Sequence, residues 1–204
     1  MKKYSTTLLL ISFIVIISMS FYFLNRLTKM EYMKDTLSTL NVDLQIKEEF
    51  YNFNFECNNM MSGKAISDIL CIGRNNEESY LSKISQDNPI LVYRYQSTCS
   101  SCKQDYTELD VMNELYSEMQ DNVIILCWQH LYKDLLIYST TNKIKIPIYV
   151  IPLDAFDWIA EKKDASYYFV LHPDMRISNI YVPNKDYPKL NKQYLEGIKR
   201  YLLE

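Results

Sequence analysis

Two cysteines, Cys99 and Cys102, stand three residues apart and are the clearest candidates for chemistry in this sequence. Such a pair can exchange disulfides, because a thiolate attacks a disulfide sulfur and a neighbouring thiol resolves the product. It can also supply half of a zinc site. The chain has no second pair with this spacing and only two histidines, His130 and His172, so a metal centre lacks further ligands. We therefore expect no metal and no other cofactor.

The surroundings of this pair are more informative than its spacing. An apolar run, Ile90 to Tyr95, precedes it and predicts a strand buried on both faces. A stripe of apolar residues at helical spacing follows, from Cys102 to Met119. A thiol at the start of a helix meets unpaired N–H groups that stabilise its thiolate. We expect Cys99 to be the outward nucleophile and Cys102, which belongs to the apolar stripe, its inner partner.

The remaining cysteines and the histidines are less promising. Cys127 lies within an apolar run and is interpreted as a buried structural thiol. Cys57 and Cys71 are expected to be separately buried free thiols, with a structural disulfide as the alternative. His130 is expected at the surface at a helix start, although it could face Cys99, and His172 is expected in a solvated turn.

The elements that must position the pair alternate along the chain. Two short runs, Phe53 to Cys57 and Ala65 to Ile72, are interpreted as a strand pair, and Asn75 to Asn88 as helix or loop. Further strands are predicted at 123–128, 144–151, 167–171 and 176–182, and helices at 131–138, 154–161 and from Pro188 onward. This order favours an α/β fold with a largely parallel sheet covered by helices and an antiparallel hairpin at one edge.

The N-terminal segment is apolar. Tyr4 to Leu24 contains no charged residue, and at ~1.5 Å per residue it can cross the ~30 Å core of a bilayer. Lys2 and Lys3 favour an N-terminus inside the cell. A cleaved signal peptide is the alternative. Apolar residues from Met30 to Leu44 then recur at three- and four-residue spacing, as in a coiled-coil stalk or a helix packed on its own domain.

Composition excludes several classes of function. The formal charge of −3 and a pI near 5.5 leave no basic surface for nucleic acid. Three glycines are too few for a Gly-rich dinucleotide loop. The 18 tyrosines are expected mainly in the core. We expect three parts: an anchor at 1–25, a helical stalk or linker at 26–50, and one domain at 51–204.

From residue 53 to the end, the chain resembles the thioredoxin-like superfamily, in particular the membrane-anchored extracytoplasmic thiol–disulfide oxidoreductases of bacteria. The resemblance rests on Leu91 to Tyr95 leading into Cys99 and Cys102, on Tyr168 to Leu171 with its following turn, and on the final helix. It implies that Cys99 attacks and Cys102 resolves. Protein thiols or disulfides are then the substrates.

The sequence departs from that family at three positions. Thr98 stands where a tryptophan usually precedes the first cysteine, and Tyr93 and Arg94 stand on the strand that often carries a buried acid. Ser166 occupies the place of the cis-proline that shapes the substrate groove, with Ile146-Pro147 as a rival register. A non-proline cis bond costs ~3 kcal/mol, so we expect a trans bond before Ser166.

The sequence thus predicts a thioredoxin-like protein that exchanges disulfides through Cys99 and Cys102, with Ser166 and Thr98 on the substrate side. It is expected in the bacterial inner membrane as a single-pass protein, with its C-terminal domain in the periplasm or otherwise outside the cytoplasm. The alternatives are a binding or assembly module of the cell envelope that has lost turnover, and a metal-binding pair. The oligomeric state is unknown from the sequence.

Overall fold

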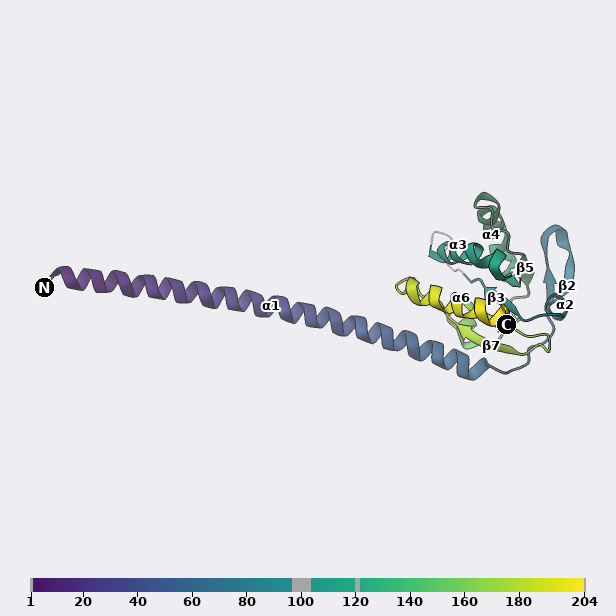
Figure 1. The fold of residues 1–204 in the computed structure, drawn as a ribbon, viewed down its shortest axis with the longest axis horizontal. Coiled ribbons are helices and arrows are strands. Elements are labelled where there is room, and N and C mark those ends of the chain that lie inside the picture. The colour runs from purple at the N-terminus through teal and green to yellow at the C-terminus, as the bar shows by residue number, and fades with distance from the viewer. Residues whose placement is uncertain (1, 97–103, 120–121, 204) are drawn as a thin grey trace. The chain divides into compact units, whose positions relative to one another are not determined.

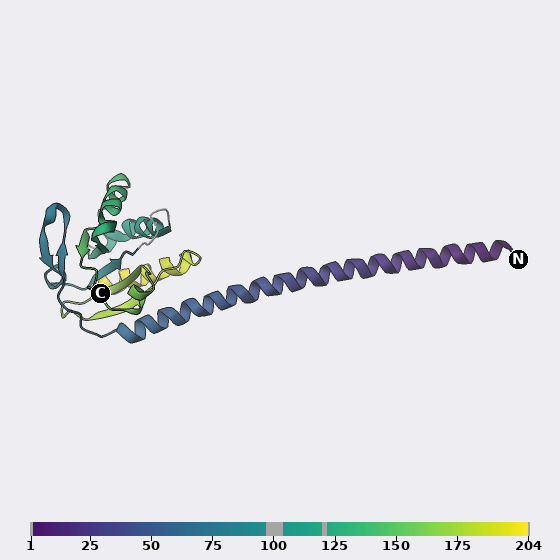
Figure 2. The ribbon, with the colours of Figure 1, turned by 180° about the vertical axis from the view of Figure 1, so that it is seen from behind.

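The structure is a computed structural model that describes residues 2–96, 104–119 and 122–203. Two compact units divide the chain, Met1–Phe50 and Tyr51–Glu204. Figures 1 and 2 show the elements from opposite sides.

Helix α1 (Lys2–Met61) begins the chain. From Phe13 on it is long and apolar enough to cross a membrane, and its apolar window is not buried. Ser18 and Ser20 donate their hydroxyl hydrogens to carbonyls one turn earlier, at 2.9 and 2.8 Å, which satisfies polar groups within the apolar stretch. The strand expected at Phe53 to Cys57 is wrong, because α1 continues to Met61.

Within the described residues, seven strands form one sheet in the order β2-β1-β5-β4-β3-β6-β7. The strands are β1 (Leu70–Ile72), β2 (Glu78–Tyr80), β3 (Ile90–Arg94), β4 (Val123–Trp128), β5 (Ile148–Ile151), β6 (Tyr167–Leu171) and β7 (Ile177–Tyr181). Only β3, β4 and β5 run parallel, and antiparallel pairs complete both edges. The expected hairpin β6–β7 is confirmed, but a second antiparallel pair, β1–β2, makes the sheet more mixed than the sequence pattern indicated.

The other helices are α2 (Leu81–Ile84), α3 (Gln104–Tyr116), α4 (Gln129–Thr141), α5 (Ile159–Lys162) and α6 (Pro188–Leu203), with 3-10 turns at Arg74–Asn76 and Ser117–Met119. Helices α3, α4 and α6 confirm the predicted helical periodicity. Helix α5 is shorter than the expected 154–161. The strand β2 falls in the segment expected to be helix or loop.

Two apolar layers sandwich the sheet. One contains Tyr93 and Ile125 together with residues of α3, α4 and α6. The other contains Val92 and Leu126 together with residues of α2, α5 and the end of α1. Helices α3 and α6 lie side by side on the first layer (Figure 1). Alternate residues of β3 therefore enter opposite layers, as strand geometry requires.

The last turns of α1 protect the edge strand β7. The Asn54 side chain accepts a hydrogen bond from the Val182 N–H at 2.6 Å and donates one to its carbonyl at 3.2 Å. Asn58 accepts another from the Ile180 N–H at 3.1 Å. These amides occupy backbone groups that would otherwise invite pairing with another chain.

Candidate functional site

The predicted redox pair lies on the chain between β3 and α3. Cys99, Cys102 and Thr98 fall outside the described residues, which stop at Gln96 and resume at Gln104. The described neighbours do fix the edge of the sheet from which this segment leaves. It is the carboxyl edge of parallel strands β3 and β4, the edge at which α/β proteins collect reactive groups.

Ser166 is joined to this edge directly. Its Oγ accepts a hydrogen bond from the Gln96 N–H at 2.9 Å and donates one to the Gln96 carbonyl at 2.8 Å. The hydroxyl thus closes the end of the β3–β6 ladder, three residues before Cys99. No described peptide bond is cis, which confirms the expected trans bond before Ser166.

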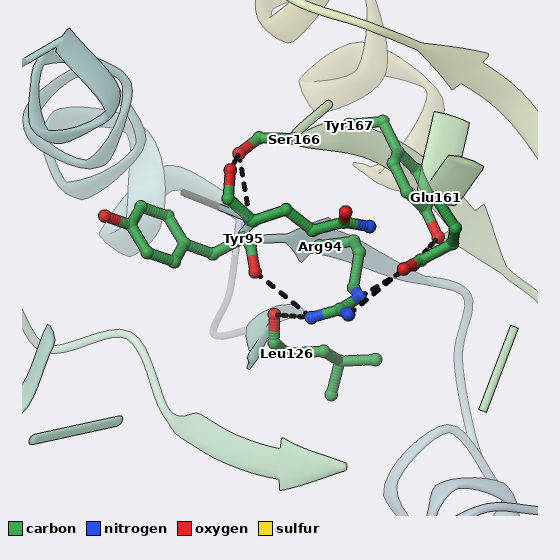
Figure 3. Close-up of polar contacts among 7 residues, drawn as sticks. Arg94, Tyr95, Leu126, Glu161, Ser166 and Tyr167 are labelled. Carbon is green, nitrogen blue, oxygen red and sulfur yellow. Dashed lines mark hydrogen bonds and ion pairs between the residues drawn. The ribbon is translucent and has the colours of Figure 1, made fainter. Parts of the chain in front are cut away.

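A buried ion pair lies two residues before Gln96, at the end of β3. Arg94 is fully buried, and its Nε and Nη2 donate to the two carboxylate oxygens of Glu161 at 2.8 and 3.2 Å. Figure 3 shows this fork, with the Tyr167 hydroxyl reaching the same carboxylate. The Tyr167 O–H donates to Glu161 at 2.7 Å, so the carboxylate accepts hydrogen bonds from both residues.

The remaining Arg94 contacts tie two parallel strands together. Its Nη1 donates to the carbonyls of Tyr95 at 3.1 Å and Leu126 at 3.4 Å. Its guanidinium carbon also lies 4.6 Å from the ring centre of Trp128. Because buried charges are stable only when paired and hydrogen-bonded, this set of contacts holds the ends of β3 and β4 in one arrangement. We call Arg94, Glu161 and Tyr167 the buried ionic lock.

Burial raises the pKa of Tyr167 well above its ordinary value, and the Glu161 carboxylate raises it further. Tyr167 therefore stays a protonated hydrogen-bond donor at physiological pH. The lock thus contributes an ion pair and hydrogen bonds at the ends of β3 and β4.

Gln96 and Trp128 bring unused hydrogen-bonding capacity to the same edge. Gln96 is only 2 % exposed, yet its side-chain amide has no partner among the described residues. The buried indole N–H of Trp128 also has none among them. Buried polar groups normally find partners, so these two mark a place where a further polar group fits.

Cys57, Cys71 and Cys127 are buried free thiols, as the sequence predicted. Burial raises the pKa of Cys57 to about 11, and those of Cys71 and Cys127 to about 12. They are protonated at neutral pH and poor nucleophiles. Cys57 lies on α1 instead of the expected strand.

Neither histidine contacts another candidate reactive group among the described residues. His130 is exposed, as expected, with its ring centre 5.6 Å from that of Trp128. His172 is partly buried instead of solvated, with its Nε2 at 2.8 Å from the Ser178 hydroxyl. Among the described residues, no three His, Cys, Asp or Glu side chains gather as a metal site would need.

Glu161, Tyr167 and Gln96 were not among the residues predicted at this edge. A signal existed, since an arginine in the otherwise uncharged run Ile90 to Tyr95 requires a buried counter-charge. The chain alone did not show which of its acidic residues supplies that charge, 67 positions away.

Comparison with known proteins bears on the fold. No family model matches the chain, and no curated protein matches it. A thiol:disulfide interchange protein from Bacteroides sp. is similar in structure, with 13 % identity and a TM-score of 0.52, covering 70 % of this chain and 91 % of that chain. The thioredoxin domain of a thiol-disulfide oxidoreductase from Bacteroides vulgatus has 14 % identity and a TM-score of 0.46, with 65 % and 97 % covered.

A thioredoxin-like protein from Porphyromonas gingivalis has 12 % identity and a TM-score of 0.48, with 70 % and 93 % covered. Identities this low show the fold alone. The similarity to the Bacteroides sp. structure shows that the chain has a thioredoxin-like α/β fold with flanking helices. A long apolar helix precedes this fold. The predicted resemblance in fold is confirmed.

Proposed function

We propose that this protein is a membrane-anchored thiol–disulfide exchange protein with Cys99 as nucleophile and Cys102 as resolving thiol. One observation carries the proposal: in a thioredoxin-like fold, the two cysteines lie on the chain between the carboxyl end of β3 and the start of α3. A thiolate there benefits from the positive end of the helix dipole.

The exchange takes place in two displacement steps. The Cys99 thiolate attacks a substrate disulfide, one substrate sulfur leaves as a thiolate, and a mixed disulfide forms. Cys102 loses its proton to solvent and attacks the Cys99 sulfur. The second substrate thiolate leaves, and the Cys99–Cys102 disulfide remains. The substrate is thus reduced by two electrons, and the reverse sequence oxidises a substrate dithiol.

The described residues support a positioning role for the edge around the pair. The buried ionic lock fixes the strand end from which the cysteine segment departs. Ser166 contributes through backbone shape, because its hydroxyl is engaged by Gln96. Thr98 and Ser166 border the substrate in this proposal.

The apolar helix suggests the location. With α1 as a single bacterial inner-membrane span and Lys2 and Lys3 inside, the C-terminal unit faces the periplasm or exterior. Disulfides persist in such oxidising compartments, where protein thiols and disulfides are the substrates.

The test is thiol labelling of the full chain in detergent micelles. After reduction, native protein at neutral pH is expected to take iodoacetamide fastest at the outward Cys99 and more slowly at the inner Cys102. The other three thiols should stay unlabelled, because they are buried and protonated. Glutathione titration is expected to show a reversible disulfide between about −300 and −100 mV.

Cys127→Ser is the matched control, since it removes a thiol without altering the titration. The proposal fails if Cys99 and Cys102 form no reversible disulfide in that range.

A second function, a binding module without turnover, is favoured by one observation. The Ser166 hydroxyl closes onto Gln96 at the position where the family carries its groove-forming proline. Replacing both Cys99 and Cys102 by serine separates the two functions, because a binding module keeps its cellular phenotype and an exchange protein loses it.

A further inference from the structure

A continuous series of tyrosine rings crosses the core layer that faces α3 and α6. In order its members are Tyr138, Tyr106, Tyr95, Tyr93, Tyr168, Tyr194 and Tyr181. The successive ring-centre distances are 4.0, 6.4, 6.3, 4.6, 5.6 and 4.4 Å. We call this series the tyrosine ladder.

The ladder connects two surfaces through the interior. Tyr138 at one end and Tyr181 at the other are partly exposed, whereas Tyr93 and Tyr168 in the middle are fully buried. Six of its rings come from β3, β6, β7, α3, α4 and α6, and Tyr95 directly follows β3, so the fold and not local sequence brings them together.

Carboxylates accept hydrogen bonds from two of the phenols. The Tyr138 O–H lies 2.9 Å from both carboxylate oxygens of Asp110, and the Tyr168 O–H donates to Glu108 at 2.9 Å. Asn191 donates to the other Glu108 oxygen at 2.7 Å and accepts from Tyr181 at 2.8 Å. These carboxylates matter chemically, because a tyrosine that loses an electron also loses its phenolic proton.

We propose that the tyrosine ladder conducts single oxidising equivalents across the domain and delivers them to Tyr138. A one-electron oxidant, such as a peroxyl radical, removes one electron from the ladder, and the electron vacancy settles at Tyr168, whose proton shifts to Glu108. An electron then passes from Tyr138 to Tyr168 through the intervening rings of Tyr106, Tyr95 and Tyr93. Tyr168 regains its proton from Glu108, and Tyr138 gives its own proton to Asp110. The vacancy rests as a neutral phenoxyl radical at Tyr138, with the proton on Asp110.

Tyr138 is the resting end because of its surroundings. It has a carboxylate that accepts through both oxygens, and solvent reaches it. A one-electron reductant of the ascorbate class can return the electron there, and Asp110 returns the proton. This activity is independent of thiol exchange and would discharge oxidants before they damage the core.

The experiment places an oxidant at the far end of the ladder. The Asn184 N–H and the Tyr181 hydroxyl both donate to the Asn191 side-chain oxygen, so residue 185 lies close to Tyr181. A ruthenium tris-bipyridine label at Lys185→Cys therefore starts the reaction near Tyr181. The background is Cys99→Ser/Cys102→Ser, which keeps the label on one cysteine because the remaining thiols are buried. Its use also separates failure of this inference from failure of the exchange function.

Light and an irreversible cobalt(III) quencher generate Ru(III), which oxidises the nearest phenol. A spin trap followed by peptide mass spectrometry then locates the radical. The expected result is an adduct at Tyr138 that disappears in Tyr138→Phe.

The decisive variant is Tyr93→Phe, which keeps a ring in the stack but removes the oxidisable phenol. The adduct at Tyr138 is expected to fall about tenfold or more, because a difference of only ~59 mV in one-electron reduction potential already changes an equilibrium tenfold. Tyr201→Phe, outside the ladder, is the control and should leave the adduct unchanged. An adduct at Tyr138 that survives Tyr93→Phe, or oxidation confined to Tyr181 in the parent, overturns the inference.

Discussion

The two faces of the sheet bury polar groups in different ways. On one face, Arg94 and Glu161 are a complete ion pair, 1 % and 8 % exposed at the side chain, with Tyr167 bound to the same carboxylate. On the other, tyrosines stack in series, and Glu108 is only partly buried. The first arrangement depends on every member, whereas the second distributes its contacts over many rings.

Arg94→Met is expected to destabilise the fold more than the other substitutions proposed. Loss of the guanidinium leaves the Glu161 carboxylate buried without a counter-charge, which costs ~3–5 kcal/mol of unfolding free energy. Urea unfolding of the full chain in micelles, followed by tryptophan fluorescence, measures it, because Trp128 and Trp158 both lie in the C-terminal unit.

Lys162→Met is the matched control for that change, since its ion pair with Asp157 is exposed and is worth ~0–1 kcal/mol. Adding Glu161→Gln to Arg94→Met should recover part of the loss, because the uncompensated charge is then removed. Strict additivity of the two changes would show that the pair is not coupled.

Alkaline pH affects both faces together. The pKa values of Tyr167 and Tyr168 are raised in the fold, first by burial and then by neighbours such as Glu161 and Tyr93. Above the ordinary value near 10, the unfolded chain loses these protons and the folded chain keeps them. Their stabilisation is complete below that pH and is lost as pH rises toward the folded values, by ~1.4 kcal/mol per pH unit for each tyrosine.

The measurement is urea unfolding at several pH values above 9.5 or so, the region of tyrosine ionisation. Tyr167→Phe and Tyr168→Phe should each reduce the slope by one proton. A slope unchanged in both variants would show that neither tyrosine carries the pH dependence.

Replacing Ser166, whose hydroxyl joins the ends of β3 and β6, should destabilise the fold less than Arg94→Met. Ser166→Ala removes both hydrogen bonds to the backbone of the buried Gln96 and leaves its N–H and carbonyl without these partners, at ~1–2 kcal/mol. Ser166→Thr keeps the hydroxyl and should retain most of the stability. If the alanine variant matches the parent in urea unfolding, the Ser166 contact is dispensable for the edge.

Sequence periodicity predicted the central strands, α3, α4 and α6, because local pattern and burial agree in them. It failed at Phe53 to Cys57, where aromatic residues favour a strand but the preceding helix continues. The order of elements made Ser166 a candidate residue, and its hydroxyl binds the Gln96 backbone, while its place at the substrate stays a prediction. Glu161 was not, because a partner 67 positions from Arg94 is selected by tertiary packing and leaves no local pattern.

Tyr167 and Tyr168 are adjacent on β6 and point to opposite faces of the sheet, so removing each hydroxyl in turn measures the two faces separately. Tyr168→Phe removes one donor from Glu108, but Asn191 still binds that carboxylate and water can reach it, so the expected cost is ~1 kcal/mol.

Tyr167→Phe removes a donor from a carboxylate that is closed to water, at ~1.5–3 kcal/mol. The same urea experiment compares the two. Equal costs would mean that the buried ion pair tolerates a lost donor as readily as the stacked tyrosines do, and the distinction between the faces would then lie in Arg94 alone.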